Sequence, residues 1–539
     1  MARLVFSTVA GASLALSLSG CPAPQVGSPC PIRESGTPEQ RAADLKACFS
    51  QLVDTPFNTS LQKDVDILFL IDNSPSMTPK QRALAMNIPR FIQKIEDTGA
   101  NYHVGIATSD VGTYVAPGQP WSISLGACNS YEGDDGTLQR VACNTRTGVS
   151  SEAVAACQAL CPDPKFVPQG GQGFISKING VTNVPKDIQM GRDLGPQKTF
   201  QCIALVGDGG CGVEGQLEGA KRALDGHNPM NNGFLRPNSV LAVIFITDED
   251  DCSVALNRRS ENDPVTMDCP APNKDAPAAC FNADYRCMAR SVVCNEPLNT
   301  PGAKTNCVER DNSYLERVDN YVRFFSSLRP ANKLLISGIW TLPRLDRGGK
   351  FIVTQRQGST RTEGLNRAEG ADAGCVYVAD ANVFGRPQIR LSKFASQFKD
   401  AIEISVCDVD KYPAALDSIA NAIKTKLEAN CLPAVPKTSG GKPLCLVGDV
   451  DVRTPNNAPD VAFPVCSDTC CNAWANSMQP TKDDPAIQTA CRNETTEACY
   501  CALPSKVGQC AEGAVFGVWR RGGADGPPDK VTNVKCAGQ

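Results

Sequence analysis

The sequence predicts an α/β protein with a doubly wound, mostly parallel sheet, long disulfide-rich insertions and a small cysteine-rich module at its C-terminal end. Two observations lead to this prediction. Strongly apolar segments of strand length alternate with amphipathic segments of helix length, which is typical of a parallel sheet covered by helices on both faces. The 539 residues also include 27 cysteines, and cysteines at this density are expected to form disulfides outside the cytoplasm.

The first twenty residues have the pattern of an export signal. Arg3 precedes a largely apolar run over 4–18, which is too short to span a membrane. The run ends in Leu-Ser-Gly-Cys, and Cys21 is its last residue. This ending resembles the lipobox of bacterial lipoproteins, which implies lipidation at Cys21 and a membrane-tethered protein of the cell envelope, at the outer membrane and facing either the periplasm or the surface. An ordinary signal peptide with a chance cysteine is the alternative.

We divide the chain by composition into four parts. They are a signal peptide over 1–20, a linker with a short helix over 21–60, a main domain over 61–434, and a cysteine-rich module over 435–539. Residues 39–53 predict the short helix, and Cys30 and Cys48 are expected to pair around it. Two Gly-, Pro- and Cys-rich stretches, near 112–200 and 252–311, interrupt the main domain and are interpreted as cross-linked insertions.

The strands and helices of the main domain follow one another in order. The apolar "VDILFLI" at 65–71 predicts a buried strand, and 80–97 predicts an amphipathic helix interrupted by Pro89. The remaining expected strands are 102–111, 239–250 and 333–340, and the remaining expected helices are 213–226, 312–328 and 412–431. In the last hundred residues, "VFGVWRR" indicates a short strand.

Charge and cysteine number limit the partners and metals. The net charge is −4 with acids and bases interspersed, so no nucleic acid partner is expected. Without Cys21, 26 cysteines remain, an even number that allows up to thirteen disulfides, although spacing does not determine their connectivity. Two histidines and the lack of Cys-x-x-Cys argue against zinc sites.

Polar residues gather where the two most apolar strands end. Asp72, Ser74 and Ser76 follow the first strand at alternate positions, and Asp248 lies just past the apolar part of the strand expected over 239–250. Ligands of doubly wound sheets bind outside the carboxyl ends of the strands. Carboxylate and hydroxyl oxygens suit Mg²⁺, Ca²⁺ or Mn²⁺. The sequence therefore predicts a divalent cation at this edge of the sheet.

The stretch "DNSPS" resembles the Asp-x-Ser-x-Ser motif of von Willebrand factor A (VWA) domains, and "ITD" resembles the aspartate after their fourth strand. The likeness covers roughly residues 60–431 and implies a Rossmann-like VWA fold. It also implies a metal-ion-dependent adhesion site (MIDAS) in which the ion accepts an acidic side chain from a protein partner. Asp72, Ser74, Ser76 and Asp248 would be its ligands, the two aspartates either directly or through water.

One position departs from the family. A threonine is expected in the loop before the next helix, but "GGCGVEGQL" places Cys211 there. Cys211 could pair with Cys252, and Glu214 could replace the missing hydroxyl as a ligand. Alternatively, the site is degenerate and holds no ion.

Simpler interpretations of single residues remain open. Asp72 could cap the following helix, although capping does not explain the two serines and Asp248. Residues 249–251 are interpreted as a solvated acidic turn, and "YEGDDG" at 131–136 as a turn that lacks the ligands of a calcium loop. His103 and His227 are interpreted as structural.

No motif for catalysis is present. The chain lacks a Gly-x-Ser-x-Gly elbow, a phosphate-binding loop and a His-Glu-x-x-His pair. We therefore expect a non-enzymatic, adhesin-like protein that binds an acidic group of a protein or surface ligand. The lipid-anchored, cysteine-rich arrangement looks like VWA lipoproteins of myxobacteria, including a gliding-motility adhesin. The alternative is a metal-free structural or assembly protein of the envelope.

Overall fold

The computed structural model describes most of the chain from residue 56 onward. The described residues are 40, 43–44, 56–60, 64–112, 132–236, 239–255, 287–288, 290–298, 300–310, 314–345, 351–357, 368–371, 374–428, 431–432, 435–439, 441–451, 459, 461–477, 482, 484–504, 514–524 and 530–537. The predicted signal peptide, Cys21, and the predicted Cys30–Cys48 pair lie outside them, as does nearly all of the helix expected over 39–53.

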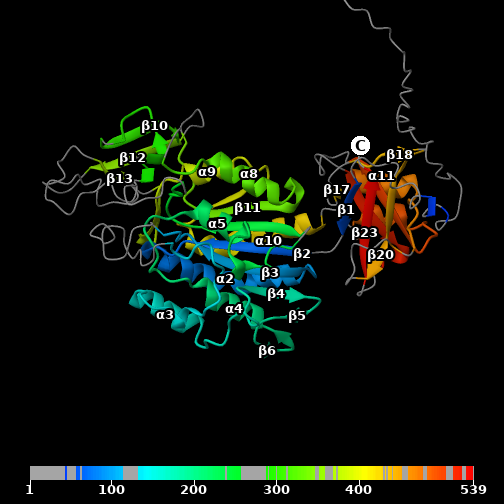
Figure 1. Ribbon diagram of the computed structural model, residues 1–539, viewed down its shortest axis with the longest axis horizontal. Coiled ribbons are helices and arrows are strands. Elements are labelled where there is room, and N and C mark those ends of the chain that lie inside the picture. The colour runs from blue at the N-terminus through cyan, green and yellow to red at the C-terminus, as the bar shows by residue number, and fades with distance from the viewer. Residues whose placement is uncertain are drawn as a thin grey trace, which may run out of the picture.

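A seven-stranded, mainly parallel sheet forms the centre of the main domain (Figure 1), in the order β16-β11-β8-β2-β3-β4-β5. The five parallel strands are β2 (Asp64–Ile71), β3 (Asn101–Thr108), β8 (Val240–Ile246), β11 (Leu334–Trp340) and β16 (Ile402–Ser405). At one edge, β4 (Phe174–Ile178) and β5 (Val181–Thr182) are antiparallel. The predicted mixed α/β architecture with a mainly parallel sheet is confirmed.

Helices cover both faces of this sheet, as the core residues show. One core contains side chains of α2 (Thr78–Glu96), α4 (Gly195–Ala204) and α10 (Tyr412–Glu428). The core on the opposite face contains side chains of α5 (Gln216–Leu224), α8 (Val318–Leu328) and α9 (Arg390–Ala395). β2, β3, β8 and β11 are buried because both faces are covered.

Helix α2 continues through Pro89, so the predicted interruption is wrong. A proline inside a helix leaves the carbonyl four residues earlier without its usual N–H donor. Here that carbonyl belongs to Ala85, and the side-chain amide of Gln201 in α4 donates to it at 3.0 Å. The packing of α4 on α2 therefore supplies the hydrogen bond that proline removes.

Both predicted insertions contain ordered, cross-linked structure. The first supplies β4, β5, α3 (Ser151–Leu160) and α4, and Cys143–Cys157 and Cys161–Cys202 cross-link it. The second contributes β9 (Val292–Val293) and β10 (Gly302–Glu309), which join β12 (Phe351–Gln357) and β13 (Ala368–Ala371) in a separate four-stranded sheet. Its described disulfides are Cys252–Cys287 and Cys294–Cys307.

Smaller elements were not predicted. The hairpin of β14 (Cys375–Tyr377) and β15 (Asp380–Gly385) is tied by Cys375–Cys407 to the loop after β16. Two further short hairpins pair β6 (Ile188–Gln189) with β7 (Arg192–Asp193), and β18 (Thr438–Ser439) with β19 (Lys442–Pro443). Helix α8 begins at Val318, later than expected, because Leu315 forms a β-bridge with Val254.

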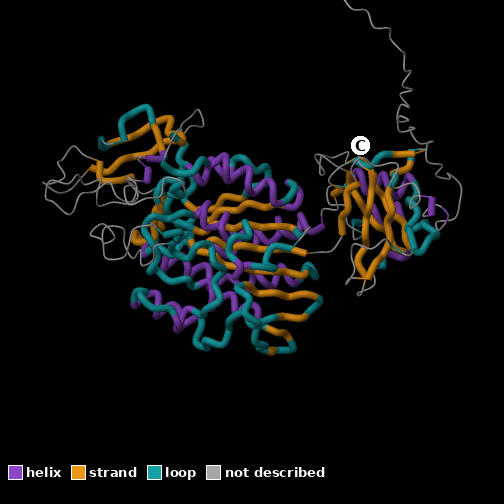
Figure 2. Tube along the Cα trace, viewed as in Figure 1, coloured by secondary structure: helices purple, strands orange, loops and turns teal. Residues whose placement is uncertain are grey.

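The C-terminal module is a second, strand-rich unit (Figure 2) with two three-stranded sheets. One has the order β1-β23-β20 and the other β17-β22-β21; α11 and α12 complete the module. Their bounds are β1 (Pro56–Ser60), β17 (Cys431–Leu432), β20 (Cys445–Asp451), α11 (Asp468–Asn476), α12 (Pro485–Cys491), β21 (Ala498–Pro504), β22 (Ala514–Arg520) and β23 (Lys530–Ala537). Strands β1 and β17 come from outside the predicted boundary of 435–539, so the main domain is inserted between two strands of this module.

Four disulfides cross-link the described part of the module. They are Cys445–Cys536, Cys466–Cys499, Cys470–Cys491 and Cys471–Cys501. The sulfurs of Cys466, Cys470 and Cys501 lie close enough together to suggest a metal site, but each belongs to a disulfide and offers no thiolate. None of the described helices is both long and apolar enough to cross a membrane.

The module should depend on its disulfides more than the main domain does, because its cores are small. Removing Cys470–Cys491 by a double alanine substitution is expected to cost about 2–5 kcal/mol of module stability. Denaturation followed through the buried Trp474 would measure this loss. A variant lacking Cys143–Cys157 in the main domain is the control, and an unchanged unfolding midpoint after loss of Cys470–Cys491 would contradict the expectation.

His103 should make the main domain sensitive to acid. Burial and the neighbouring Arg236 lower the pKa of His103 from 6.5 to about 4. The unfolded chain takes up this proton below pH 6.5 and the folded chain does not, so stability should fall by about 3 kcal/mol as the pH drops from 6.5 to 4. Denaturation at several pH values should show a smaller acid loss in His103→Gln.

His227 serves as a control for His103, because its pKa is shifted in the opposite direction. Partial burial disfavours its charged form, but the hydrogen bonds that its ring donates to Asp225 and Asp135 outweigh this and raise its pKa. Its stabilising contribution is present below pH 6.5 and is lost as the pH rises. The variant His227→Gln should therefore retain the acid loss that His103 causes, and an equal effect of both substitutions would contradict the assignment.

Candidate functional site

The predicted ligands meet at the carboxyl edge of the central sheet. Strand β2 pairs in parallel with β8, and the ladder continues one step further because the Asp72 backbone N–H donates to the Ile246 carbonyl at 2.9 Å. This register places Asp72 beside the residues that follow β8, which are Thr247 and Asp248. Ser109, directly after β3, lies on the other side of Asp72.

The side-chain oxygens of Ser74, Ser76 and Asp248 form a short chain. The two serine Oγ atoms are 3.3 Å apart, and Ser76 Oγ donates to Asp248 Oδ1 at 3.0 Å. Neighbouring oxygen ligands of an octahedral ion with bonds of about 2.1 Å lie about 3 Å apart. The separations and the chemistry of these oxygens therefore fit a small divalent cation.

Three donors hold the carboxylate of Asp72. Its Oδ1 accepts hydrogen bonds from the Ser74 backbone N–H at 2.8 Å and from Ser109 Oγ at 3.4 Å. Its Oδ2 accepts a hydrogen bond from Thr247 Oγ1 at 2.7 Å. These contacts orient Asp72 within the site, and Asp72 caps no helix through its side chain, because the hydrogen bond to Ser74 lies before α2 begins.

Burial and the nearby Asp248 carboxylate raise the pKa of Asp72 to about 6. Both aspartates are fully buried, and two buried carboxylates at short range repel each other. A cation between them would relieve this repulsion, so the electrostatics of the pair also favour a positively charged occupant.

A cation of the protein itself already contacts one carboxylate of this pair. Lys80, in the first turn of α2, is fully buried, and its Nζ donates to Asp248 Oδ2 and to the Ser76 carbonyl, the latter at 3.0 Å. The same ammonium lies 5.4 Å from the centroid of the Phe384 ring. Asp248 is therefore shared between the serine hydroxyl on one oxygen and an ammonium on the other.

Gln81 joins the two loops that contain Asp72 and Gly207 by hydrogen bonds. Its side-chain amide donates to the carbonyls of Asp72 and Gly207, both at 2.8 Å, and its Oε1 accepts from the Gly207 N–H at 3.2 Å. A Cβ at Gly210 would lie 2.2 Å from Asn73 Oδ1, which explains the glycine there. Asn73 Oδ1 is buried without a hydrogen-bond partner in the described part of the chain.

Cys211 and Cys252 are both disulfide-bonded, but the predicted bond between them is wrong. Cys252 pairs with Cys287, from the second insertion, and Cys211 is fully buried in another disulfide. The Cys211 backbone N–H donates to Asp110 Oδ2 at 3.3 Å. Sequence spacing could not have shown that Cys252 pairs with Cys287, 35 residues further along the second insertion.

Glu214 is buried and lines a hollow with Glu249, Asp250, Cys252 and Arg386, on the side of the Cys252–Cys287 disulfide. Its backbone carbonyl accepts from the Cys252 N–H at 2.7 Å. Its role as a substitute ligand stays a prediction.

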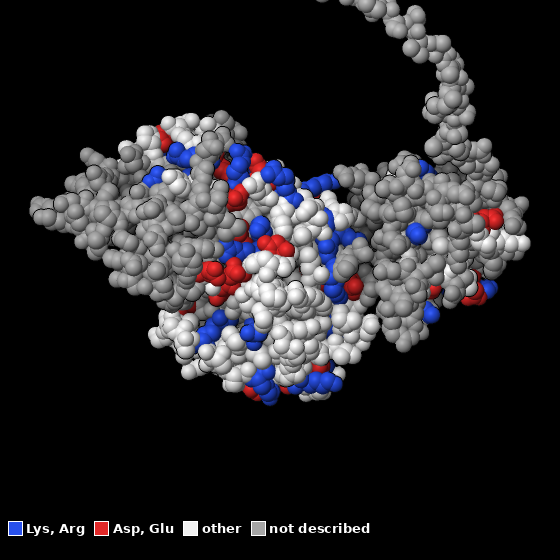
Figure 3. Space-filling view, viewed as in Figure 1, with Lys and Arg blue, Asp and Glu red and all other residues white. Residues whose placement is uncertain are grey.

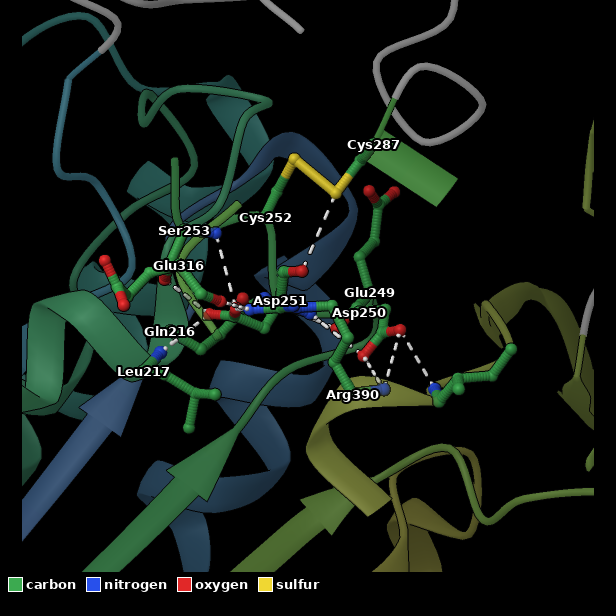
Figure 4. Close-up of a disulfide and its surroundings, with 11 residues drawn as sticks. Gln216, Leu217, Glu249, Asp250, Asp251, Cys252, Ser253, Cys287, Glu316 and Arg390 are labelled. Carbon is green, nitrogen blue, oxygen red and sulfur yellow. Dashed lines mark hydrogen bonds and ion pairs between the residues drawn. A yellow bond between two sulfur atoms is a disulfide. The ribbon is translucent and has the colours of Figure 1, made fainter. Parts of the chain in front are cut away.

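In the acidic run after Asp248, Asp250 and Asp251 are not the solvated side chains that were expected, as Figure 4 shows. Asp250 accepts backbone N–H bonds from Ile389, Arg390 and Leu391, and Asp251 forms a fully buried ion pair with Arg390 at 2.9 Å. Arg390 also bonds to Glu309 of β10 at 2.8 Å. These aspartates therefore hold α9 and the second insertion against the edge of the sheet that carries the site.

The predicted turn at 131–136 is also held by protein contacts in its described part. Asp134 accepts a hydrogen bond from Thr108 at 2.6 Å, and Asp135 pairs with His227 and with Arg222. Both acidic side chains are engaged in these contacts.

Comparisons with known proteins assign no family. No family model matches the chain, and no curated protein matches it. Among solved structures, the pilus adhesin SpaC from Lactobacillus rhamnosus GG is 12% identical over 89% of this chain and 40% of its own, with a TM-score of 0.28. The pilus adhesin RrgA from Streptococcus pneumoniae is 11% identical over 90% of this chain and 57% of its own, with a TM-score of 0.17. Scores this low support no assignment of fold or function.

Sequence reasoning missed three residues of the site. Thr247 and Ser109 directly follow apolar strands, so their position was a usable signal. Lys80 lies four residues after Ser76, a spacing that places residues on one face of a helix, but nothing in the sequence indicates that its ammonium is buried.

Gln81 should be needed for the geometry of the site. Gln81→Met removes the donors and the acceptor that join the Asp72 and Gly207 loops, and leaving buried partners unsatisfied should cost about 1–3 kcal/mol. Chemical denaturation would measure this loss. Gln93→Met, on the same helix but bonding to Asp97 at the surface, is the control, and equal stabilities of the two variants would contradict the role of Gln81.

Proposed function

We propose that the protein is a lipid-anchored protein of the cell envelope whose main domain, of the VWA type, binds an acidic group of a protein or surface ligand through a divalent cation. Asp72, Ser74, Ser76 and Asp248 would hold the ion, and the ion would accept the acidic group of the partner. The observation that supports this most directly is the convergence of the Ser74, Ser76 and Asp248 oxygens at separations of 3.3 and 3.0 Å.

The disulfides support the location. Nine described disulfides cross-link the chain, and bonds of this kind persist in oxidising compartments outside the cytoplasm. Attachment through lipid at Cys21 and a place at the outer membrane belong to the proposal. On the face drawn in Figure 3, acidic and basic side chains are interspersed over the described surface, which suits a protein partner better than nucleic acid.

The proposed role is binding and not catalysis. The side chains at the site are carboxylates, hydroxyls and one lysine whose ammonium is committed to Asp248. Those groups can coordinate an ion and an acidic ligand, and no motif for a nucleophile with its base accompanies them.

A metal-free structural or assembly protein is the second candidate. The Lys80–Asp248 ion pair favours it, because the pair compensates one buried carboxylate without any added ion. In that case the domain would serve as a scaffold, and partner binding would not respond to chelators.

Ion binding separates the two candidates. If the site binds Mg²⁺, Mn²⁺ or Ca²⁺, the ion should stabilise the folded chain by ~2.7 kcal/mol at a hundredfold excess over Kd, which thermal denaturation would detect. Asp72→Ala should abolish the stabilisation and any chelator-sensitive binding to envelope proteins. Because Asp72 is buried, Ser76→Ala, at a half-buried hydroxyl, should weaken ion binding with less effect on folding.

Asp97→Ala is the matched control, since Asp97 is an exposed carboxylate at the far end of α2. It should leave ion binding unchanged. Calorimetry that detects no binding of any of the three ions to the oxidised protein would reject the metal site and leave the scaffold.

A further inference from the structure

Lys80 contacts the same two residues that would supply half of the metal site. Its Nζ donates to Asp248 Oδ2 and to the Ser76 carbonyl, while Ser76 Oγ donates to Asp248 Oδ1. The lysine side chain is fully buried. A buried ammonium must be paired, because transfer from water without compensation is very costly.

The surroundings of Lys80 hold the ammonium in place. The ring of Phe384, at the end of the β14–β15 hairpin, lies 5.4 Å from Nζ, and the guanidinium of Arg386 lies 4.8 Å from the centroid of the same ring. The Arg386 N–H bonds to the Asp248 carbonyl at 2.6 Å. The hairpin therefore covers the ion pair and is joined to the backbone of the candidate ligand.

The charge of the site is incompletely compensated by this lysine. Asp72 and Asp248 supply two carboxylates, and Lys80 supplies one ammonium that bonds to Asp248. Within the described part of the chain, the donors to the Asp72 carboxylate are neutral and are the Ser74 N–H and the hydroxyls of Ser109 and Thr247. The site can therefore accept further positive charge. A divalent metal ion that binds there must, however, share Asp248 with the Lys80 ammonium, which repels the ion.

We propose that Lys80 is the resident cation of this site. It compensates Asp248 in the protein without metal, and it competes with a divalent ion for the same carboxylate, which weakens ion binding. The first part, compensation of Asp248 by Lys80, depends only on the observed ion pair. The second part, competition with a divalent ion, rests on the proposed metal-dependent function. Ion binding would then weaken the contact of Lys80 with Asp248. Because Phe384 and Arg386 join the β14–β15 hairpin to these two residues, ion binding would also affect that hairpin.

The first part is tested without metal, in excess chelator. Lys80→Met keeps the length of the side chain and removes its charge, and Asp248→Asn removes the opposite charge. Each single variant should lower the denaturation midpoint, because each leaves a buried charge unpaired. The double variant should lose clearly less than the sum of the two losses. Strictly additive losses would overturn the assignment, and a double variant that folds where Lys80→Met does not would support it.

The second part is tested by titrating Mg²⁺, Mn²⁺ and Ca²⁺ into wild type and Lys80→Met by calorimetry. We expect the variant to bind at least tenfold more tightly than wild type. Lys94→Met is the matched control, because Lys94 lies on the same helix and pairs with Asp417 near the surface at 3.4 Å; it should match wild type.

The outcomes separate the two proposals. Tighter binding by Lys80→Met supports the competition. If the variant binds an ion and wild type does not, the competition stands while the metal-dependent function of the wild-type protein is rejected. Equal or weaker binding by Lys80→Met overturns the competition while the metal site stands. If neither protein binds an ion, the metal site and the competition both fail, and the denaturation measurements alone decide whether Lys80 is the resident cation.

Discussion

The parallel pairing of β2 with β8 is the interaction on which the site depends. Ile71 lies opposite Ile246, so the two strands end together and their following residues share one edge of the sheet. The bond from the Asp72 N–H to the Ile246 carbonyl extends this register into the loops. A shift of one residue would turn the apolar side chains of β2 to the wrong face, so the core that buries the strand also specifies where Asp72 lies.

Burial of charge is the second constraint. The edge of the sheet carries Asp72, Asp248 and Asp251, all fully buried, and each needs partners. Lys80 forms an ion pair with Asp248, and Arg390 forms one with Asp251. Asp72 accepts hydrogen bonds from hydroxyl and backbone donors. Because Arg390 also holds Glu309, the charge compensation beside the site links the sheet to the second insertion.

Disulfides perform a different task in the two units of the chain. In the main domain they attach insertions to a sheet whose two large cores are already extensive. In the C-terminal module they cross-link short strands around small cores, where apolar burial alone supplies less stability. The pairing of β1 with β23 brings the chain just before the main domain into that module, so both connections to the main domain start from it.

Apolar periodicity and the order of the elements along the chain predict the alternation of strands and helices, the α/β class and the sheet edge at which Asp72, Ser74, Ser76 and Asp248 meet, because both can be read from the chain alone. Tertiary packing determines how Pro89 is accommodated, since the compensating donor comes from Gln201 on another helix. It also decided that Cys252 pairs with Cys287, that Asp250 and Asp251 hold α9, and that Lys80 contacts Asp248. Each of these contacts joins groups that packing brings together from distant parts of the chain. The charge of a residue and its position in the sequence do not show which group will become its partner in the folded protein.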